Sequence, residues 1–474
     1  MNKIKIIQGG MGVAVSDWKL ARAVSKEGQL GVISGTGVHI VMVARLMEGD
    51  IGGHVRRALS HFPFHDPVEW VLKEYYRENP KEGATYKRPQ MWSFTPSKAL
   101  NELTILANFV ETFLAKEGHD NPVGINLLEK IQMPIMASLY GAMLAGIDYV
   151  IMGAGIPLQI PGILDKLALH EKVNYRMDVK GSTSDDNFLM EFNPKAIFSG
   201  VAEKVQGLLR PDFFPIISSV VLAKTLIRRS TGKVNGFVVE GHIAGGHNAP
   251  PRGRMKISEN GEPIYGEKDM PKLEKIKELG LPFWLAGGYA SPKMLKDAQD
   301  AGAEGIQVGT IFAFCNESGM AEKEKRNVLQ KVADEEAEVF TDPLVSPTGY
   351  PFKVVQLEDT MSNPDIYEAR PRLCDVGLLR EAYKRDDGKI GYRCAAEPKK
   401  QYIKKGGKAE DTEGRGCLCN NLGASAGFPQ HRKDGYVEQP IVTSGNWLPY
   451  LGRVFKEGKR DYSAKDVLDY LLGK

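Results

Sequence analysis

Eight short apolar runs recur along the first 308 residues of the chain, each bounded by glycine or polar residues. They span Lys5–Gln8, Leu30–Ser34, Val123–Leu127, Tyr149–Met152, Phe214–Ser218, Phe237–Glu240, Phe283–Ala286 and Gly305–Val308. Such runs are typical of strands in a parallel sheet that is buried on both faces. Eight parallel strands close a (β/α)8 TIM barrel, which is therefore the predicted α/β fold. A doubly wound open sheet is the alternative, because periodicity alone does not separate the two.

Segments with helical periodicity lie between most of these runs. The predicted helices are Ser16–Lys26, Ile135–Ala145, Ser219–Ser230 and Pro292–Ala301. The last has the clearest start signal, because Ser291 can cap the helix and Pro292 suits its first position. Strands that alternate with helices in this way support the barrel.

Two stretches interrupt the alternation and are predicted to be insertions in a barrel of residues 1–340. One runs from about 39 to 122 and contains a helical segment, Pro67–Arg77. The other, about 171–197, has strand-like alternation in Val173–Val179 and a polar loop at Ser182–Asn187, which predicts a β-hairpin outside the barrel.

Residues 341–474 form a predicted C-terminal extension, rich in Gly, Pro, Lys and Asp. Within it, Tyr402–Arg415 is expected to be a mobile loop. The segment Ser463–Leu472 is expected to be an amphipathic helix with Ser463 as its cap. Polar residues set among glycines suggest that the extension folds over the barrel mouth as a lid; they are Asn420, Asn421, Gln430 and Ser444.

Composition narrows the classes of partner. The chain has 474 residues and a net charge of only +3, which gives no support to nucleic acid or an anionic membrane as the partner. No apolar run approaches the roughly 20 residues of a membrane helix, and no signal peptide is visible, so a cytoplasmic enzyme is expected. A homo-oligomer is compatible with the sequence.

Cysteine usage argues against a disulfide framework, because five is an odd number. Four cysteines lie late in the chain: Cys374, Cys394, Cys417 and Cys419. The Cys417-Leu418-Cys419 spacing is closer than that of a zinc knuckle, and the other two are isolated, so no metal site is predicted.

Glycine stands at nearly every predicted strand end, where a barrel builds its active site. The ends include Gly9-Gly10-Met11-Gly12, Ser34-Gly35-Thr36-Gly37, Gly153-Ala154-Gly155, Gly245-Gly246-His247, Gly287-Gly288 and Gly309-Thr310. Any one of these glycines is explained by a turn. Together they predict a flat ligand that lies against backbone. Barrels often bind phosphate with the loops after strands seven and eight, and a flat ring with one phosphate is flavin mononucleotide.

The chain resembles the FMN-dependent nitronate monooxygenases, also called 2-nitropropane dioxygenases, and comparably the flavin-type enoyl-acyl-carrier-protein reductases. The matching segments come in the family's order and cover most of residues 1–320. They are Ile7–Met11, Val123–Asn126, Ser218–Lys224, Glu240-Gly241 with Ala244–His247, Ala286–Gly288, Gly302–Thr310, and Glu317-Ser318.

The resemblance implies a (β/α)8 barrel that holds FMN. Gly10, Met11 and Gly12 would contact the isoalloxazine ring and Asn126 would hydrogen-bond it, while Gly287, Gly288, Gly309 and Thr310 would hold the phosphate. Ser219, Gly245 and Gly246 are also expected at the cofactor, and His247 matches the family's catalytic histidine. Two departures put the substrate in doubt: Ile243 stands where many relatives have glutamate, and the glycine common two residues after the histidine is absent.

Three functions follow from the resemblance. A nitronate monooxygenase would oxidise an alkyl nitronate with FMN and O2, with His247 orienting the substrate or taking its α-proton. An enoyl reductase would take electrons from NAD(P)H and reduce an enoyl thioester. The third is a flavin-binding barrel without a reaction.

Other polar or aromatic residues near these motifs have simpler explanations. His242 is expected to brace its loop or face solvent, Arg252 and Arg254 to be solvated, and Trp284 to belong to the core. Glu240 is expected either to brace His247 or to pair with a lysine.

Overall fold

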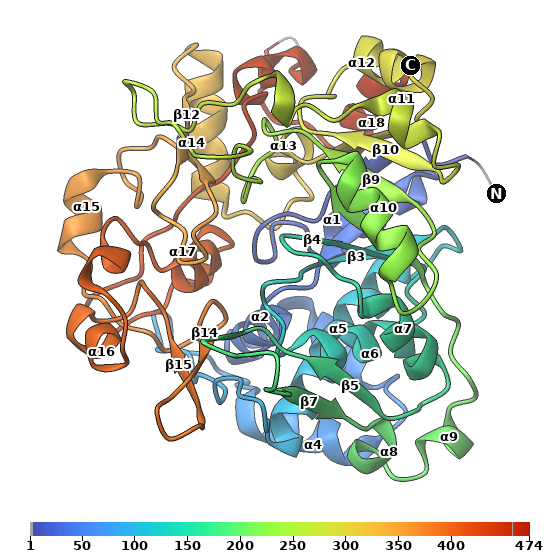
Figure 1. The fold of residues 1–474 in the computed structure, drawn as a ribbon, viewed down its shortest axis with the longest axis vertical. Helices are drawn as coiled ribbons and strands as arrows, with labels where there is room; N and C mark the ends of the chain where they lie inside the picture. The colour runs from blue at the N-terminus through green and yellow to red at the C-terminus, as the bar shows by residue number, and fades with distance from the viewer. Residues whose placement is uncertain (1–2, 457) are drawn as a thin grey trace.

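The computed structural model describes residues 3–456 and 458–474, and its centre is a closed barrel of eight parallel strands (Figure 1). The strands are β1 (Ile6–Gln8), β2 (Leu30–Ser34), β3 (Val123–Leu128), β4 (Tyr149–Gly153), β8 (Asp212–Ile217), β9 (Phe237–Glu240), β10 (Phe283–Ala286) and β11 (Gly305–Val308). Because β1 pairs with both β2 and β11, the barrel closes. The predicted TIM barrel is confirmed, and the open-sheet alternative is wrong.

Apolar side chains fill one end of the barrel. Phe214 stacks on Trp284 with their ring centroids 5.0 Å apart, and the Trp284 indole N–H donates to the carbonyl of Ile4. Since Ile4 precedes the first strand, these apolar side chains close the end of the barrel opposite the carboxyl ends of the strands. Trp284 is buried, which confirms its place in the core.

The predicted helices form, with small shifts at their ends. They are α1 (Trp18–Lys26), α6 (Ile135–Leu144), α10 (Val220–Arg229) and α12 (Pro292–Asp300). Ser291 caps α12 by accepting from the backbone N–H of Met294, as its sequence predicts. Further helices around the barrel are α7 (Ile160–Ala168), α11 (Leu273–Lys277), α13 (Thr310–Ala313) and α14 (Glu322–Ala333), with a 3-10 turn, η2, at Glu267–Asp269.

The segment after β2 is more helical than its sequence predicts. The predicted helix is α4 (His65–Tyr75). Four further elements were not predicted individually: α2 (Val38–Met47), η1 (Ile51–Gly53), α3 (His54–Leu59) and α5 (Lys98–Lys116). Most residues of α2 and α5 are buried, on every side of each helix. A helix that is buried on most sides lacks the contrast between an apolar and a polar face by which helices are found.

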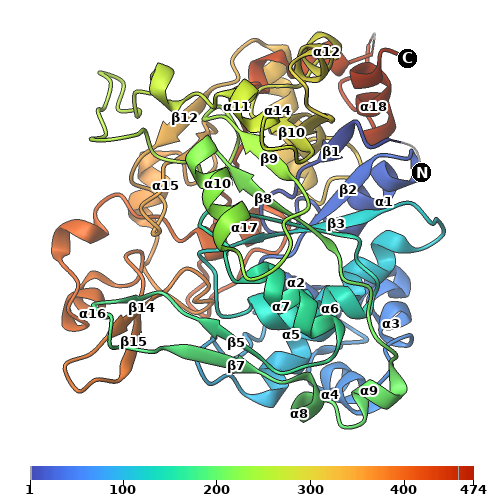
Figure 2. The same ribbon diagram turned by 45° about the vertical axis from the view of Figure 1, so that its right-hand side comes forward.

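Outside the barrel, β5 (Val173–Arg176) pairs antiparallel with β7 (Leu189–Phe192), as the predicted hairpin requires. The short strand β6 (Val179–Lys180) instead pairs with β14 (Glu381–Lys384), which pairs with β15 (Ile390–Arg393). Figure 2 shows these strands side by side, so the hairpin region and the C-terminal extension form a shared sheet. Two short helices, α8 (Pro194–Ile197) and α9 (Val201–Lys204), lead back to the barrel.

The C-terminal extension is regular in many places. It contains β12 (Val339–Asp342), β13 (Phe352–Val355), α15 (Pro364–Ala369), α16 (Lys399–Lys404), η3 (Ala409–Thr412), α17 (Leu418–Ser425), η4 (Leu448–Val454) and α18 (Ala464–Leu472). The expectation of a mobile loop at 402–415 is wrong, because α16 and η3 occupy much of it and Tyr402 is buried. The predicted final helix is confirmed, with a capping box between Ser463 and Asp466.

Within the described ranges, none of the helices is both long enough and apolar enough to cross a membrane.

Candidate functional site

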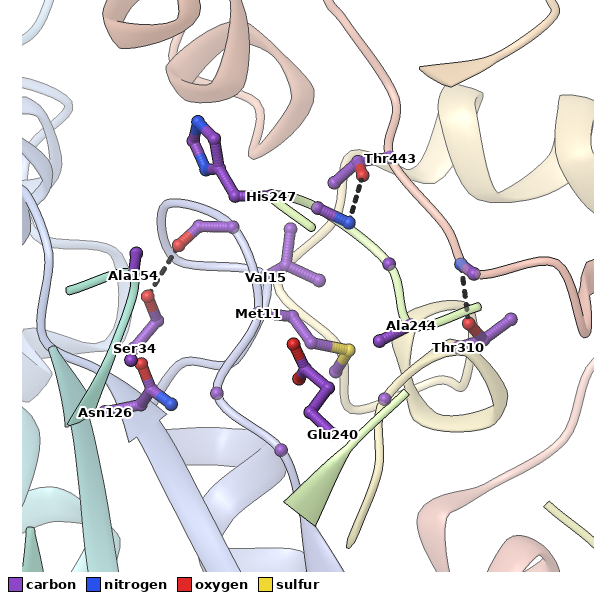
Figure 3. A pocket seen from close by; sticks show the side chains of 18 of the residues that line it. Met11, Val15, Ser34, Asn126, Ala154, Glu240, Ala244, His247, Thr310 and Thr443 are labelled. Carbon is purple, nitrogen blue, oxygen red and sulfur yellow. Dashed lines mark hydrogen bonds between the residues drawn. The ribbon is translucent and has the colours of Figure 1, made fainter. Parts of the chain in front are cut away.

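The carboxyl ends of the barrel strands enclose a cavity of about 240 Å³, called here the first cavity. That volume exceeds the roughly 150 Å³ of an engineered cavity known to hold benzene, so it has room for a ring system. The sequence-predicted residues that line it are Gly10, Met11, Gly12, Asn126, Gly245, Gly246, His247, Gly287, Gly288, Gly309 and Thr310. Figure 3 shows several of them around the cavity.

Ser219 is the one predicted cofactor residue that does not line this cavity. Its side chain accepts from the backbone N–H of Leu222 and so caps α10. A serine at a strand end that precedes a helix is as well placed for capping as for binding, and in this structure the Ser219 side chain serves as the cap.

Several cavity glycines leave no space for a side chain. A Cβ on Gly10 would lie 2.5 Å from the Cβ of Asn126, and one on Gly288 would lie 2.2 Å from Cδ1 of Ile243. Gly246 differs, because a Cβ there would meet no atom within 4 Å. Its bare backbone therefore faces open space, as contact with a flat ring requires. The glycine-lined wall thus fits a flavin.

The loop between β10 and α12 suits a phosphate. Within the described residues, the backbone N–H groups of Gly288 and Tyr289 donate to no protein acceptor. None of the described residues lining the first cavity is a lysine or arginine. Phosphate binding here would therefore depend on backbone N–H groups and the nearby start of α12, as in other helix-terminal anion sites.

Two amides supply polarity to the floor of the cavity. Asn126 stands on β3 and lies close to Gly10. Gln307 stands on β11, and its buried Oε1 has no hydrogen-bond partner among the described residues. Sequence reasoning missed Gln307, although it lies within the Gly302–Thr310 match. A buried amide oxygen without a partner is available to a ligand.

His247 lies at the edge of the cavity, and its ring points away from Met11 and Glu240 (Figure 3). Its Nε2 lies 2.7 Å from the hydroxyl oxygen of Ser346, and its ring packs edge-on against Phe352. Burial lowers the pKa of His247 to about 4, so the imidazole is neutral near pH 7. With Nε2 held by Ser346, Nδ1 is the ring nitrogen left for a ligand, as donor or acceptor according to the tautomer.

Glu240 ends β9, and neither role expected for it is found. Among the described residues its carboxylate has no hydrogen bond to His247 and no ion pair with a lysine. Burial raises its pKa to about 7. His247 is held by Ser346 instead, a residue 99 positions away that no local pattern links to the histidine.

A second cavity, also of about 240 Å³, adjoins the first. It is lined in part by His242, Arg252, Tyr265 and Asp269. His242 stacks on Tyr265 with centroids 4.3 Å apart, which confirms the expected bracing role. Arg252 is exposed as predicted, and its guanidinium donates to the carbonyl of Ser218.

The C-terminal extension supplies part of the first cavity's wall. Its lining residues are Phe352, Leu378, Leu379, Leu418, Cys419, Leu422, Thr443, Ser444, Gly445 and Trp447. The Thr443 hydroxyl accepts from the N–H of Gly246, so the extension contacts the glycine turn directly (Figure 3). Of the four polar residues singled out in the sequence, only Ser444 lines the cavity. The side chains of Asn420, Asn421 and Gln430 are buried and donate hydrogen bonds to residues that do not line the cavity.

Four cysteines of the extension, Cys374, Cys394, Cys417 and Cys419, line one small cavity and are free thiols. The described part of the chain contains no group of three or more His, Cys, Asp or Glu arranged to hold a metal ion.

Part of the chain matches a known protein family. The sequence model of the nitronate monooxygenase family matches residues 201–347, which include β8 to β11 and the Gly245-Gly246-His247 turn. No curated protein gives a significant sequence match to the chain.

Solved structures similar to the chain come from three kinds of protein. FabK from Thermotoga maritima is 15% identical, with 99% of this chain and 92% of FabK covered and a TM-score of 0.46. Nitroalkane oxidase from Streptomyces ansochromogenes is 13% identical, with 99% and 95% covered and a TM-score of 0.46. The enoyl reductase domain of MlnA from Bacillus amyloliquefaciens is 10% identical, with 99% and 94% covered and a TM-score of 0.45.

The match to the nitronate monooxygenase family model therefore covers the part of the chain that supplies four barrel strands and the Gly245-Gly246-His247 turn.

Proposed function

We propose that the protein is an FMN-dependent nitronate monooxygenase that oxidises alkyl nitronates with O2. The observation that carries the proposal is the first cavity, where glycine backbone from several strand ends meets His247. Gly10, Met11 and Gly12 would lie against the flavin ring, and Asn126 would hydrogen-bond it. Gly287, Gly288, Gly309 and Thr310 would surround the phosphate. When bound, the flavin supplies the redox chemistry.

His247 serves to orient the substrate. With its pKa lowered to about 4 by burial, it stays neutral at working pH. Its contact with Ser346, whose hydroxyl also bonds that of Thr348, fixes the ring at the cavity edge. A histidine held in one orientation positions a nitro or nitronate oxygen better than a freely rotating one.

The C-terminal extension acts as a lid that excludes water. Leu418 and Leu422 of α17 and Trp447 place apolar surface over the cavity. Exclusion of water strengthens the polar contacts of a bound anion and protects reactive intermediates.

An NAD(P)H-dependent reductase of the enoyl type is the second candidate. The second cavity favours it, because a space of about 240 Å³ beside the first can receive a separate electron donor or an acyl group.

Anaerobic mixing separates the two functions. The purified holoenzyme is mixed with propyl nitronate and, in separate samples, with NADH and NADPH, while flavin absorbance is followed. Bleaching by nitronate alone supports the monooxygenase. Bleaching by a nicotinamide alone overturns it in favour of the reductase.

A further inference from the structure

The first and second cavities meet at a shared wall. Four residues line both: Ala154, Ile216, Glu240 and His247. Only two of these carry a group that can accept a proton. Of the residues shared by the two cavities, Glu240 and His247 are therefore the candidates for proton transfer to or from a molecule in the second cavity.

Glu240 is the better proton acceptor of the two. Burial raises its pKa to about 7, whereas burial lowers the pKa of His247 to about 4. A general base works best when its pKa lies near the operating pH. In addition, the His247 Nε2 is engaged by Ser346, while the described residues offer the Glu240 carboxylate no hydrogen-bond or ion-pair partner.

The position of Glu240 is fixed by the barrel. It is the last residue of β9, in register with Ala286 of β10, and β9 also pairs with β8. Figure 3 shows its side chain beyond the strand end and beside Met11, and Glu240 lines both cavities. A carboxylate on a barrel strand is held more firmly than one on a loop.

Among the described residues, the charged and titratable groups around Glu240 form no ion pair or hydrogen bond with its carboxylate. On the second-cavity side they are His242, His247, Arg252, Tyr265, Asp269 and Tyr350. On the first-cavity side they are Tyr289 and Cys419. Arg252 is directed to the carbonyl of Ser218, and Asp269 accepts from the backbone N–H groups of Arg252 and Gly266. Desolvation alone therefore sets the pKa of Glu240.

The lining of the second cavity suits a small ligand that has an apolar part and a polar part. Ile156, Ile217 and Leu222 supply apolar surface, and Arg252 supplies one cation. A short alkyl chain with a nitro group matches this combination, because the chain packs against the apolar side chains and the nitro oxygens face polar groups.

We infer that the second cavity binds neutral nitroalkanes and that the Glu240 carboxylate removes their α-proton, so that the enzyme makes its own nitronate. This inference rests on the proposed function. In the step, the α C–H bond breaks and an O–H bond forms on Glu240. The C–H electron pair becomes the C=N bond of the nitronate, and the negative charge moves to the nitro oxygens.

The test compares two forms of one substrate in the holoenzyme. Flavin reduction is measured anaerobically with 1-nitropropane and with preformed propyl nitronate, for wild type, Glu240→Gln and Glu259→Gln. Glu259 is an exposed carboxylate on the connection after β9 and serves as the control. Glu240→Gln should lower the rate with nitropropane about 10²-fold and leave the nitronate rate within about threefold. The wild-type nitropropane rate should rise through about pH 7, and this rise should vanish in the variant.

Equal losses with both forms, or no loss with either, would overturn the role of Glu240. Failure of wild type to react with either form would instead overturn the proposed function, and the inference with it. Retained flavin absorbance shows that each variant is folded. Glu240→Asp keeps a carboxylate at a shorter reach and should restore part of the nitropropane rate.

A separate variant tests the second cavity. Ala249 is exposed at its wall, and Ala249→Trp fills space there without touching the first cavity. The KM for nitropropane should rise about tenfold or more, with an unchanged flavin spectrum. An unchanged KM would show that the substrate does not occupy the second cavity.

Discussion

The backbone N–H of Gly445 donates a 2.9 Å hydrogen bond to Thr310 Oγ1 and so joins the C-terminal extension to the start of α13, just after the last barrel strand. The two residues are 135 positions apart. Gly445 is also tightly fitted, because a Cβ there would lie 2.9 Å from the carbonyl oxygen of Ile243. The extension is therefore part of the wall of the first cavity.

Thr310→Val should weaken this junction. The substitution keeps the shape of the side chain but leaves the buried N–H of Gly445 without its acceptor, at a cost of about 1–3 kcal/mol. Urea unfolding measures the loss, and flavin affinity should fall with it. The control is Thr225→Val, whose hydroxyl bond to Val221 lies at the surface of α10. Equal effects of the two variants would contradict the role of the junction.

Gly287→Ala should impair flavin binding. Gly287 has a φ of +83°, and a Cβ would lie 2.7 Å from the carbonyl oxygen of Gly241. The new side chain brings left-handed strain of about 1–2 kcal/mol and also displaces backbone beside the cavity. FMN titration should show affinity at least tenfold weaker.

Gly280→Ala separates strain from displacement. Gly280 also has a positive φ, +75°, but a Cβ there meets nothing within 4 Å. This variant should lose a similar amount of stability to strain and bind flavin as the wild type does. Weak flavin binding in both variants would show that strain alone is responsible.

His247→Ala should leave flavin bound while turnover of nitronate falls about 10²-fold or more. The loss follows from the missing orientation of the substrate. His119→Ala is the control, because within the described residues the His119 side chain hydrogen-bonds only to the carbonyl of Ala115, near the end of α5. Full turnover in His247→Ala would remove this histidine from the reaction.

Glu240→Gln should change how stability depends on pH. The folded-state pKa of Glu240 is about 7, above the ordinary value of 4.5. Between these values the folded protein holds a proton that the unfolded chain has lost, so stability falls as pH rises through this window. Glutamine removes that dependence. At pH 8 the variant should be more stable than wild type by up to about 3 kcal/mol, and at pH 4 nearly equal.

Urea unfolding of flavin-free protein at the two pH values measures this difference. Glu259→Gln should show the wild-type dependence, since its carboxylate is exposed. If Glu240→Gln showed the same pH dependence of stability as wild type, a group other than Glu240 would be responsible for it.

The sequence predicted the barrel well because buried parallel strands leave an unmistakable local pattern. The bounds of β2, β9, β10 and β11 agree with the predicted apolar runs. Prediction failed for α2 and α5, most of whose residues are buried, so that neither helix has the contrast between a buried and an exposed face by which helices are found.

The candidate site was predictable only where its residues lie at strand ends. The glycine turns fall on one cavity because parallel strands bring their carboxyl ends together. Ser346, Thr443 and Gly445 come from the extension and reach the cavity through contacts that no local spacing records. Packing also decides what Glu240 contacts. The sequence suggested His247 or a lysine as its partner, and among the described residues the fold brings neither into contact with its carboxylate.

The most direct test of the central claim is the flavin content of the purified protein, measured by visible absorbance and by identification of the cofactor released on denaturation. The purified protein should show an oxidised-flavin spectrum and release about one FMN per chain, and propyl nitronate should bleach the flavin in the absence of O2. A colourless protein that takes up no FMN on incubation would contradict it.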